Sequence, residues 1–190
     1  MLGSSGVGKT SIMKRFLDGT FDNNQDVTLG ALYLLKMHEF EGETYQMHLW
    51  DTAGSEKYAP LANIYYRDAQ VAILVYDITA KESFDTLKKW YEEVLTQGPE
   101  DIVFAIVGNK ADLARKREVD EFKVNIFAGQ IGAINILTSA KDNQGVQELF
   151  QEICQNVKER DLFVKPEKNN RVLTPDEDEK APSESKGRCC

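Results

Sequence analysis

The segment Gly3–Thr10, with the sequence GSSGVGKT, constrains this chain more than any other stretch. It matches the pattern G-x-x-x-x-G-K-[S/T], in which glycines let the backbone wrap closely around phosphate groups so that its N–H groups point inward. A helix that begins directly after the loop adds its positive N-terminal end. We expect Lys9 to reach the β- and γ-phosphates of a nucleoside triphosphate and the Thr10 hydroxyl to bind Mg²⁺. The pattern does not distinguish between the bases.

Only Met1 and Leu2 precede this loop, although a phosphate-binding loop normally follows a strand. In a sheet that carries a phosphate-binding loop, that strand would be a central one. Without it the backbone groups of the neighbouring strands would lack hydrogen-bond partners. Two interpretations follow: the natural start lies upstream of Met1, or the fold is compromised. We favour the first.

Short apolar runs alternate with amphipathic stretches along the rest of the chain. The run VAILVYD has almost no polar interruption, which is typical of a buried parallel strand. The patterns predict strands over 31–40, 45–50, 71–77, 102–107 and 134–138, and helices over 10–17, 81–96, 120–130 and 146–159. Strands that alternate with helices predict an α/β fold with a mostly parallel central sheet, covered by helices on both faces.

The composition of the chain changes near residue 162. The segment 1–161 has the mixture of apolar and charged residues found in globular domains, whereas 162–190 is rich in Pro, Lys, Glu, Asp and Ser. We therefore expect one domain over 1–161 and a flexible tail over 162–190. The formal net charge of −8 argues against nucleic acid as a partner, because such binding depends mainly on Lys and Arg.

Two further motifs follow predicted strands and indicate which base is bound. In GNKAD, residues 108–112, the Asp112 carboxylate can accept hydrogen bonds from the N1–H and 2-amino groups of guanine, which adenine does not offer. A site built around that pair rejects the wrong base strongly. In TSAKD, residues 138–142, the backbone N–H of Ala140 can donate to the guanine carbonyl oxygen. Because both motifs accompany a phosphate loop, they predict a guanine nucleotide.

The motif DTAG, residues 51–54, supplies a carboxylate directly after a predicted strand. We expect Asp51 to hold Mg²⁺ through water and the N–H of Gly54 to contact the γ-phosphate. Thr28, in the polar loop after the first helix, would complete the metal shell when the γ-phosphate is present. Taken alone, Asp51 would be an ordinary turn residue. Its position directly after a predicted strand favours a role in metal binding instead.

These four motifs, in this order and spacing, resemble the Ras-type small GTPases over about residues 1–160. WDTAG followed by YYRDAQ, then YDIT and ESF with Trp90, is similar to the Rab pattern, and the Cys-Cys terminus fits it. The segments TLGALYLL and NKADLARKREVD resemble the endosomal branch of the Rab family. The resemblance implies a P-loop NTPase small G domain with its first strand truncated, which binds GTP or GDP with Mg²⁺.

The resemblance also assigns binding residues. Phe21 would pack on the guanine edge, and an ordinary core phenylalanine is the alternative. Loops 22–33 and 53–67 would be switches that the γ-phosphate orders. The implied nucleotide contacts are Ser5, Gly6, Val7, Gly8, Lys9, Thr10, Ser11, Phe21, Thr28, Gly54, Asn109, Lys110, Asp112, Ser139, Ala140 and Lys141.

An aromatic triad belongs to the effector surface of the family, and it falls here on Tyr33, Trp50 and Tyr65. Exposed aromatic side chains are suited to a binding hot spot. Plain core packing is the alternative, and it competes more strongly for Tyr65 than for Trp50.

Ser55 occupies the position at which most relatives carry a glutamine that orients the attacking water. Serine is too short to reach that water, so we expect intrinsic hydrolysis to be slower by about one to two orders of magnitude. Lys9 and Gly54 would still contribute to catalysis. GTPase-activating proteins (GAPs) of the TBC type bring an arginine and a glutamine in trans, and such a partner would bypass the defect.

Cys189 and Cys190 end the chain, and Cys154 lies on a predicted helix, where we expect a core thiol. An odd count with two adjacent terminal cysteines gives no disulfide framework. By the resemblance both terminal cysteines would carry geranylgeranyl groups, which agrees with the need for two lipids in stable anchoring. Two unmodified cysteines are the alternative.

The leading interpretation is a Rab-like GTPase, a membrane-trafficking switch that recruits effectors in its GTP state and hydrolyses GTP slowly unless assisted. The implied partners are effectors, an exchange factor, a TBC-type GAP, and a GDP dissociation inhibitor or escort protein, at the cytoplasmic face of an endosomal or vesicular membrane. The alternative suggested by Ser55 is a nucleotide-locked binding module with negligible turnover. An ATP-dependent phosphotransferase conflicts with Asp112 and with the lack of an acceptor-substrate domain.

Overall fold

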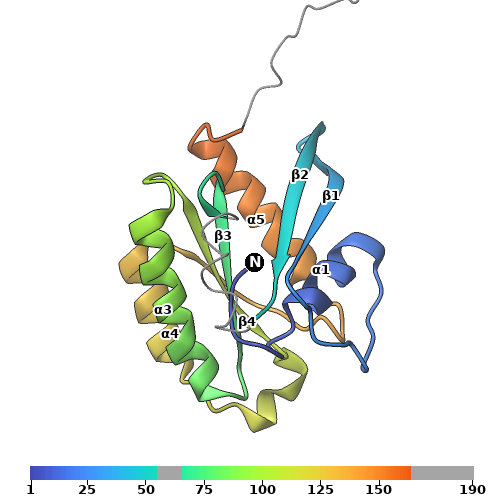
Figure 1. The fold of residues 1–190 in the computed structure, drawn as a ribbon, viewed down its shortest axis with the longest axis vertical. Helices are drawn as coiled ribbons and strands as arrows, with labels where there is room; N and C mark the ends of the chain where they lie inside the picture. The colour runs from blue at the N-terminus through green and yellow to red at the C-terminus, as the bar shows by residue number, and fades with distance from the viewer. Residues whose placement is uncertain (55–65, 164–190) are drawn as a thin grey trace, which may run out of the picture.

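The structure is a computed structural model, and it describes residues 1–54 and 66–163 of the 190-residue chain. Helices and strands alternate along it, as Figure 1 shows. In chain order these elements are α1 (Lys9–Asp18), β1 (Ala31–Phe40), β2 (Glu43–Thr52), β3 (Val71–Asp77), α3 (Lys81–Gln97), β4 (Val103–Asn109), the 3₁₀ helix η2 (Ala111–Lys116), α4 (Glu121–Ile131), β5 (Ile134–Leu137) and α5 (Val146–Glu159).

The strands form two groups. β1 and β2 are an antiparallel hairpin, paired from Ala31 opposite Thr52 to Phe40 opposite Glu43. β3, β4 and β5 form a parallel sheet with β4 in its centre. Parallel neighbours need a crossover connection, and α3 and α4 provide the two crossovers. The expected α/β fold of a small G domain is confirmed.

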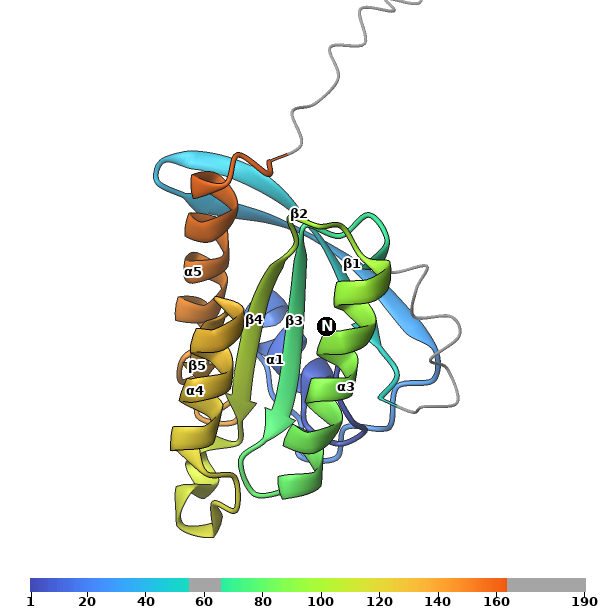
Figure 2. The same cartoon turned by 90° about the vertical axis from the view of Figure 1, so that its left-hand side faces the viewer.

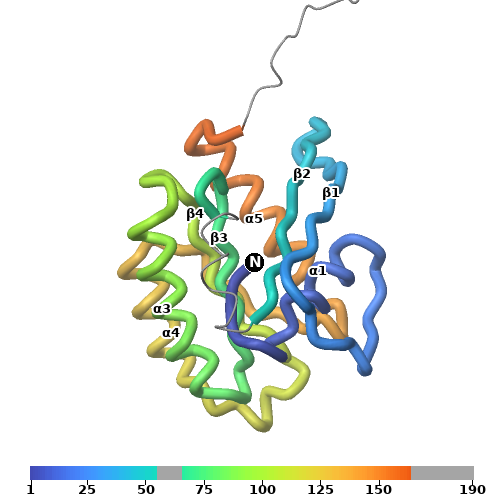
Figure 3. Tube along the Cα trace, viewed as in Figure 1, coloured from blue at the N-terminus to red at the C-terminus, as the bar shows by residue number. Residues whose placement is uncertain are grey.

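The N-terminus lies between these two groups of strands (Figures 1 and 3). The Leu2 N–H donates to the Ile73 carbonyl at 2.8 Å, and the Val75 N–H donates to the Leu2 carbonyl at 2.8 Å. On the other side, the Met1 ammonium donates to the Trp50 carbonyl at 2.6 Å. Met1 and Leu2 therefore connect β2 with β3, and each of these strands is hydrogen-bonded to the N-terminal segment over only a short stretch.

Both faces of the parallel sheet are covered, as expected for strands without polar interruption, and Figure 2 shows these strands running between helices. Every residue of β4 is buried. On one face, Trp90 of α3 and Val124 of α4 belong to one buried cluster. On the other, Phe16 of α1 stacks on Phe150 of α5 with 3.5 Å between ring centroids, in a second cluster. The domain therefore has two cores, one on each face of the sheet.

The predicted strands and helices are confirmed with small differences at their ends. β2 is longer than the predicted 45–50, because its ladder with β1 continues to the turn. In that turn Glu41 and Gly42 have φ values of 50° and 80°, as a two-residue hairpin turn requires. β5 ends at Leu137, because the chain then folds into a loop closed by backbone hydrogen bonds of 2.9 and 3.0 Å between Ser139 and Gln144.

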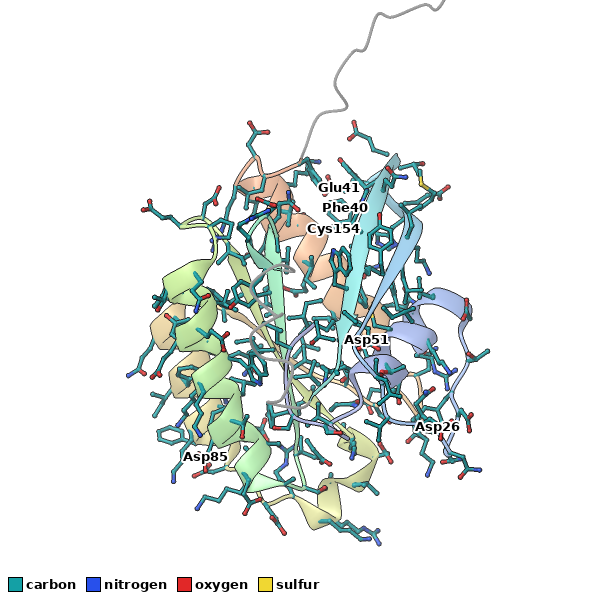
Figure 4. The ribbon with its side chains drawn as sticks, viewed as in Figure 1. Asp26, Phe40, Glu41, Asp51, Asp85 and Cys154 are labelled. Atoms are coloured by element: carbon teal, nitrogen blue, oxygen red, sulfur yellow. The ribbon has the colours of Figure 1, made fainter. Side chains whose placement is uncertain are left out.

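The end of α5 contacts the tip of the β1–β2 hairpin. Lys158 forms an exposed ion pair with Glu41, and its ammonium lies 6.0 Å from the centre of the Phe40 ring. Beyond the helix, Phe163 stacks on Tyr45 with 4.1 Å between ring centroids. Figure 4 labels Phe40 and Glu41 at this tip. The last described residues are therefore fixed against the hairpin.

Cys154 is buried within α5, which confirms the expected core thiol, and burial raises the pKa of its thiol. The predicted tail lies outside the described residues from residue 164 onward. Within the described ranges no helix is both long and apolar enough to cross a membrane.

Candidate functional site

A cavity of about 380 Å³ opens where the carboxyl ends of the strands meet the phosphate loop. Its lining comes from segments that are far apart in the sequence: the phosphate loop, the loop 21–28, the end of β2, and the loops after β4 and β5. In open parallel sheets, ligands bind at the carboxyl ends of the strands. The fold thus brings the separately predicted motifs to one place.

The phosphate loop is closely packed against its neighbours. Gly8 precedes α1 with a φ of 98°, and a Cβ atom there would lie 2.2 Å from the Asn109 side-chain nitrogen. A Cβ atom on Gly54 would lie 2.3 Å from the Ser5 backbone nitrogen. Larger residues would push these segments apart, so both glycines are required by the close approach of the loops.

Lys9 is buried at the base of the phosphate loop. Its ammonium donates to the carbonyl oxygens of Gly3 at 2.8 Å and Ser4 at 3.0 Å. Burial lowers the pKa of Lys9 to about 8, and the Asp51 carboxylate partly opposes this shift. A phosphate anion would favour the charged ammonium, so the lysine is suited to an anionic ligand.

Three oxygen-bearing side chains meet next to Lys9. The Thr10 hydroxyl donates to Asp51 Oδ2 at 2.5 Å, and 2.7 Å separates it from the Thr28 hydroxyl. Asp51 is fully buried, and its Oδ1 has no hydrogen-bond partner among the described residues. A buried carboxylate with an unused oxygen and two hydroxyls is a donor set that suits Mg²⁺, which takes few protein ligands and keeps several waters.

This oxygen set contains a single carboxylate. In the part of the chain that the structure describes, no group of three or more His, Cys, Asp and Glu side chains could hold a metal ion. A cation here would therefore depend on the ligand's own phosphates, which is typical of Mg²⁺ in nucleotide sites.

Asn109 organises the opposite end of the cavity. Its buried side chain donates to the Val7 carbonyl at 2.8 Å and accepts from the Thr138 hydroxyl at 3.1 Å and the Ala140 N–H at 3.4 Å. One amide thus connects the phosphate loop with the loop after β5. Since Asn109 ends β4, the sheet itself fixes this connection.

Asp112 is held in place by the loop after β5. Ser139 is fully buried, and its hydroxyl donates to Asp112 Oδ1 at 2.8 Å. The same hydroxyl accepts from the Asp142 N–H at 3.0 Å. The second carboxylate oxygen of Asp112 has no hydrogen bond to a described residue, and Asp112 lines the cavity. The carboxylate is therefore oriented before any base is bound.

The comparisons with known proteins agree with this geometry. The Ras family matches residues 1–159. Human Rab-22A, a Ras-related protein, is 42% identical over 190 residues, covering 100% of this chain and 95% of the relative. Human Rab-31 is 43% identical over 190 residues, again 100% of this chain and 95% of the relative. Rab-5A of Dictyostelium discoideum is 43% identical over 157 residues, which cover 83% of this chain and 78% of the relative.

This chain is a Rab protein of the Ras family. The members of that family are small GTPases, enzymes that bind guanine nucleotides and hydrolyse GTP. The expected family is thereby confirmed, and the cavity is the place where the motifs of this Rab protein come together.

Most of the predicted nucleotide contacts line the cavity. They are Ser5, Gly6, Gly8, Lys9, Thr10, Ser11, Phe21, Thr28, Gly54, Asn109, Lys110, Asp112, Ala140 and Lys141. Val7, Ser139 and Asp51 are buried behind the lining. Phe21 lines the cavity and also packs against the second core, and its packing on the guanine edge stays a prediction.

Arg15 of α1 was not predicted, although it connects both halves of the site. Its Nε donates to the Ala140 carbonyl at 2.7 Å, its Nη2 donates to the Lys141 carbonyl at 3.0 Å, and its Nη1 donates to the Gly19 carbonyl. The guanidinium therefore ties α1, which follows the phosphate loop, to the loop after β5. Only its place on a helix was visible in the sequence.

Lys110 has a partner that was also missed. Its ammonium lies 2.6 Å from Asp77 Oδ2 at the end of β3, and Lys110 adopts a left-handed φ of 67°. The ion pair directs the lysine stem along the cavity wall. Gln25, in the loop before Thr28, also lines the cavity, with a buried side-chain oxygen that has no partner.

Two members of the predicted effector triad lie side by side. Tyr33 and Trp50 are directly opposite each other in the β1–β2 ladder, with 4.8 Å between ring centroids. They are 43% and 37% exposed, which argues against plain core packing of Trp50. The Tyr33 hydroxyl lies 2.7 Å from His48 Nδ1. The third member, Tyr65, lies outside the described residues, as do Ser55, Cys189 and Cys190.

Proposed function

We propose that this Rab protein binds GTP and GDP with Mg²⁺ in the 380 Å³ cavity and acts as a switch that recruits effectors in its GTP state. The observation that carries the proposal is that phosphate, metal and base residues from distant segments line this one cavity or support its walls. Participation in membrane trafficking follows from Rab membership.

Each residue of the site has a distinct role in the proposed reaction. Lys9 exchanges its two backbone carbonyl partners for phosphate oxygens, where its charge opposes the charge that develops in the transition state. The Gly54 N–H contacts the γ-phosphate. Thr10 and Thr28 would hold Mg²⁺, and Asp51 would hold it through water; the ion would supply positive charge beside the phosphates. Together these groups bind and orient the triphosphate.

The base is selected at the opposite end of the cavity. Asp112 accepts hydrogen bonds from N1–H and the 2-amino group of guanine, and the Ala140 N–H donates to the guanine carbonyl. Ser139 and Asn109 hold these two groups in position. Adenine would leave the Asp112 carboxylate without donors, which is the physical basis of discrimination.

Hydrolysis is limited by Ser55, which lacks the length to orient the attacking water. We propose slow intrinsic turnover, about one to two orders of magnitude below that of a glutamine-bearing relative, with recovery by a TBC-type GAP. The second candidate is a nucleotide-locked module with negligible turnover, and the serine itself favours it.

The test begins with the nucleotide that co-purifies with the full chain, identified after denaturing extraction. GDP supports the switch, GTP supports the locked module, and an empty site or ATP would contradict guanine nucleotide binding. Single-turnover hydrolysis of Ser55→Gln should then be faster by about 10- to 100-fold, whereas Ser55→Ala should match the natural protein. Full recovery of the natural protein with a TBC-type GAP would eliminate the locked module.

At the membrane, we propose that Cys189 and Cys190 carry geranylgeranyl groups and that a GDP dissociation inhibitor or escort protein binds the lipidated form. The similarity to Rab-22A and Rab-31 supports an endosomal or vesicular membrane, with the domain on its cytoplasmic face. Mass spectrometry after treatment with a Rab prenyltransferase and escort protein should find two lipids on the chain, and none on the Cys189→Ser/Cys190→Ser variant.

A further inference from the structure

A second cavity, of about 540 Å³, lies on the side of the domain formed by α4, β5 and the first half of α5. Figure 2 shows these three elements next to one another. In the described ranges, the two cavities share no lining residue. Nothing in the proposed nucleotide chemistry uses this second cavity.

The floor of this cavity holds a polar group without a partner. Tyr76, at the end of β3, is only 1% exposed, yet its side chain lines the cavity. Its hydroxyl forms no hydrogen bond with any described residue, so the hydroxyl oxygen can accept one from a ligand in the cavity. Burial raises the pKa of Tyr76 to about 12, so the phenol stays neutral and offers an acceptor oxygen. The floor is therefore prepared for a polar ligand.

Among the described residues, the rim carries three carboxylates and no cationic side chain. Glu121 comes from α4, and Glu148 and Glu152 come from α5. Glu148 and Glu152 are four residues apart on the same helix face, a like-charge spacing that destabilises a helix. Arg117 lies 3.9 Å from Glu121, and its charge also acts on the Tyr76 phenol, so Glu148 and Glu152 are the rim carboxylates without an ion pair to a described residue. The rim therefore favours a positive charge.

The walls combine apolar surface with amide groups. Val124 and Leu137 provide the apolar part. The Asn135 side-chain nitrogen donates to Asn125 Oδ1 at 2.7 Å, which leaves the Asn135 side-chain oxygen as a further acceptor. An aliphatic stem that ends in a cation matches such walls, because it places its methylenes on apolar surface and its charge beside the acceptors.

An apolar patch on α4 adjoins the cavity. Phe122 and Ile126 are one helical turn apart, and they are 69% and 45% exposed. Each directly follows a residue that lines the cavity, Glu121 or Asn125, so the patch lies about 100° around the helix from the cavity. A partner that places a cation in the cavity would therefore have apolar surface to cover beside it.

We propose that the second cavity is the docking site for a Lys or Arg side chain of a partner protein, and that an apolar residue next to that side chain covers Phe122 and Ile126. The cation donates hydrogen bonds to the Tyr76 hydroxyl and the Asn135 side-chain oxygen, and pairs with Glu148 and Glu152. This surface is separate from the nucleotide cavity, so the inference does not rest on the proposed nucleotide chemistry.

The test uses two matched peptides as probes, acetyl-Leu-Lys-Leu-amide and the same peptide with norleucine in place of lysine. They share the apolar part and differ in the ammonium group. Binding to the full ¹⁵N-labelled chain is followed by amide chemical shifts. We expect saturable shifts near Asn125, Asn135 and Gly145 with the lysine peptide and affinity at least about fivefold weaker with the norleucine peptide.

Variants separate the parts of the proposed site. Glu148→Gln/Glu152→Gln should weaken the lysine peptide about tenfold, and Tyr76→Phe should weaken it less, whereas Glu92→Gln at an exposed position of α3 should change nothing. Phe122→Ser should weaken the peptide but leave binding of n-butylammonium unchanged. The thermal midpoint and bound nucleotide confirm that each variant is folded.

Two outcomes would overturn the proposal. Equal binding of both peptides would show that the rim charges do not select a cation. Binding of n-butylammonium alone, without preference between the peptides, would assign the cavity to a free amine and not to a partner protein. In either case the extracted nucleotide is unaffected, so failure here is distinguishable from failure of the nucleotide proposal.

Discussion

The two ends of the nucleotide cavity differ in how their polar groups are employed. At the base end, Ser139 and Asn109 position the groups that would meet guanine, and one oxygen of Asp112 remains available. At the phosphate end, Lys9 is bonded to the carbonyls of its own loop, and Thr10 is bonded directly to Asp51. The groups at the base end are already positioned for a ligand, whereas the groups at the phosphate end are hydrogen-bonded to one another.

This difference has an energetic consequence. Preorganised groups bind without a cost of rearrangement, whereas groups that already satisfy one another must exchange their partners. Recognition of guanine should therefore depend on fixed geometry. Binding of the phosphates and Mg²⁺ should depend on a local rearrangement and on the ionisation of Lys9.

The largest effect is expected at the preorganised end. Asp112→Asn places an amide NH₂ donor opposite the 2-amino group of guanine, whereas the C2 carbonyl of xanthine can accept from it. GTP affinity should therefore fall by about 10⁴-fold, and xanthosine triphosphate should become the preferred ligand. Competition binding against a fluorescent guanine nucleotide measures both changes. Asp142→Asn, in which the backbone contact to Ser139 is kept, is the control. Unchanged base preference in Asp112→Asn would refute the assigned role.

A smaller effect is expected at the metal group. Thr10→Val keeps the shape of the side chain but removes the hydroxyl that contacts Asp51 and Thr28. Mg²⁺-dependent nucleotide affinity should fall by about 10- to 100-fold, whereas affinity measured in a chelator should change little. Thr86→Val on α3, which also removes a hydroxyl, serves as control. An equal loss with and without Mg²⁺ would mean that the hydroxyl acts only in packing.

The connection between the two ends is tested through Arg15. Arg15→Met removes the guanidinium that bonds to the Ala140 and Lys141 carbonyls, so GDP should dissociate about tenfold faster. Arg15→Lys should recover part of the loss, and Lys14→Met on the same helix should match the natural protein. The Mg²⁺ dependence should stay unchanged. If Arg15→Met releases GDP at the natural rate, the two halves are not coupled through this residue.

The smallest expected effect is a pH dependence at the phosphate end. Because the pKa of Lys9 is about 8 without ligand, the free protein loses this charge above that pH, and phosphate binding must restore it. Nucleotide affinity should fall by about threefold between pH 7.5 and 8.5. The stability of the nucleotide-free protein should rise over the same range, since the folded form binds fewer protons than the unfolded chain. Isothermal titration in buffers of different ionisation enthalpy measures the proton uptake, and its absence would contradict the shifted pKa.

Sequence patterns were sufficient for the framework of this molecule. The buried strands lie where continuous apolar runs predicted them, and Asp51, Asn109 and Thr138 lie at or just beyond strand ends, as their motifs implied. These are local features, because a strand and the loop that follows it are encoded in adjacent residues.

The contacts between distant segments were not predictable in this way. Arg15 and Ala140 are 125 positions apart, and their hydrogen bond depends on how α1 lies beside the loop after β5. Asp77 and Lys110 meet because β3 and β4 are neighbours in the sheet, where Asp77 is opposite Asn109. The direct bond from Thr10 to Asp51 follows from the local packing of three side chains, which no single motif specifies.

The two cores of the domain bear on how such a protein can diversify. The cluster that contains α3 and α4 shares no residue with the nucleotide cavity, whereas Phe21 and Ala140 connect the other cluster to it. Over evolutionary time, substitutions around α3 and α4 can alter the outer surface while the reaction is preserved at the carboxyl ends of the strands. A gene duplicate could thus acquire a new binding specificity on α4 and retain its inherited enzymology.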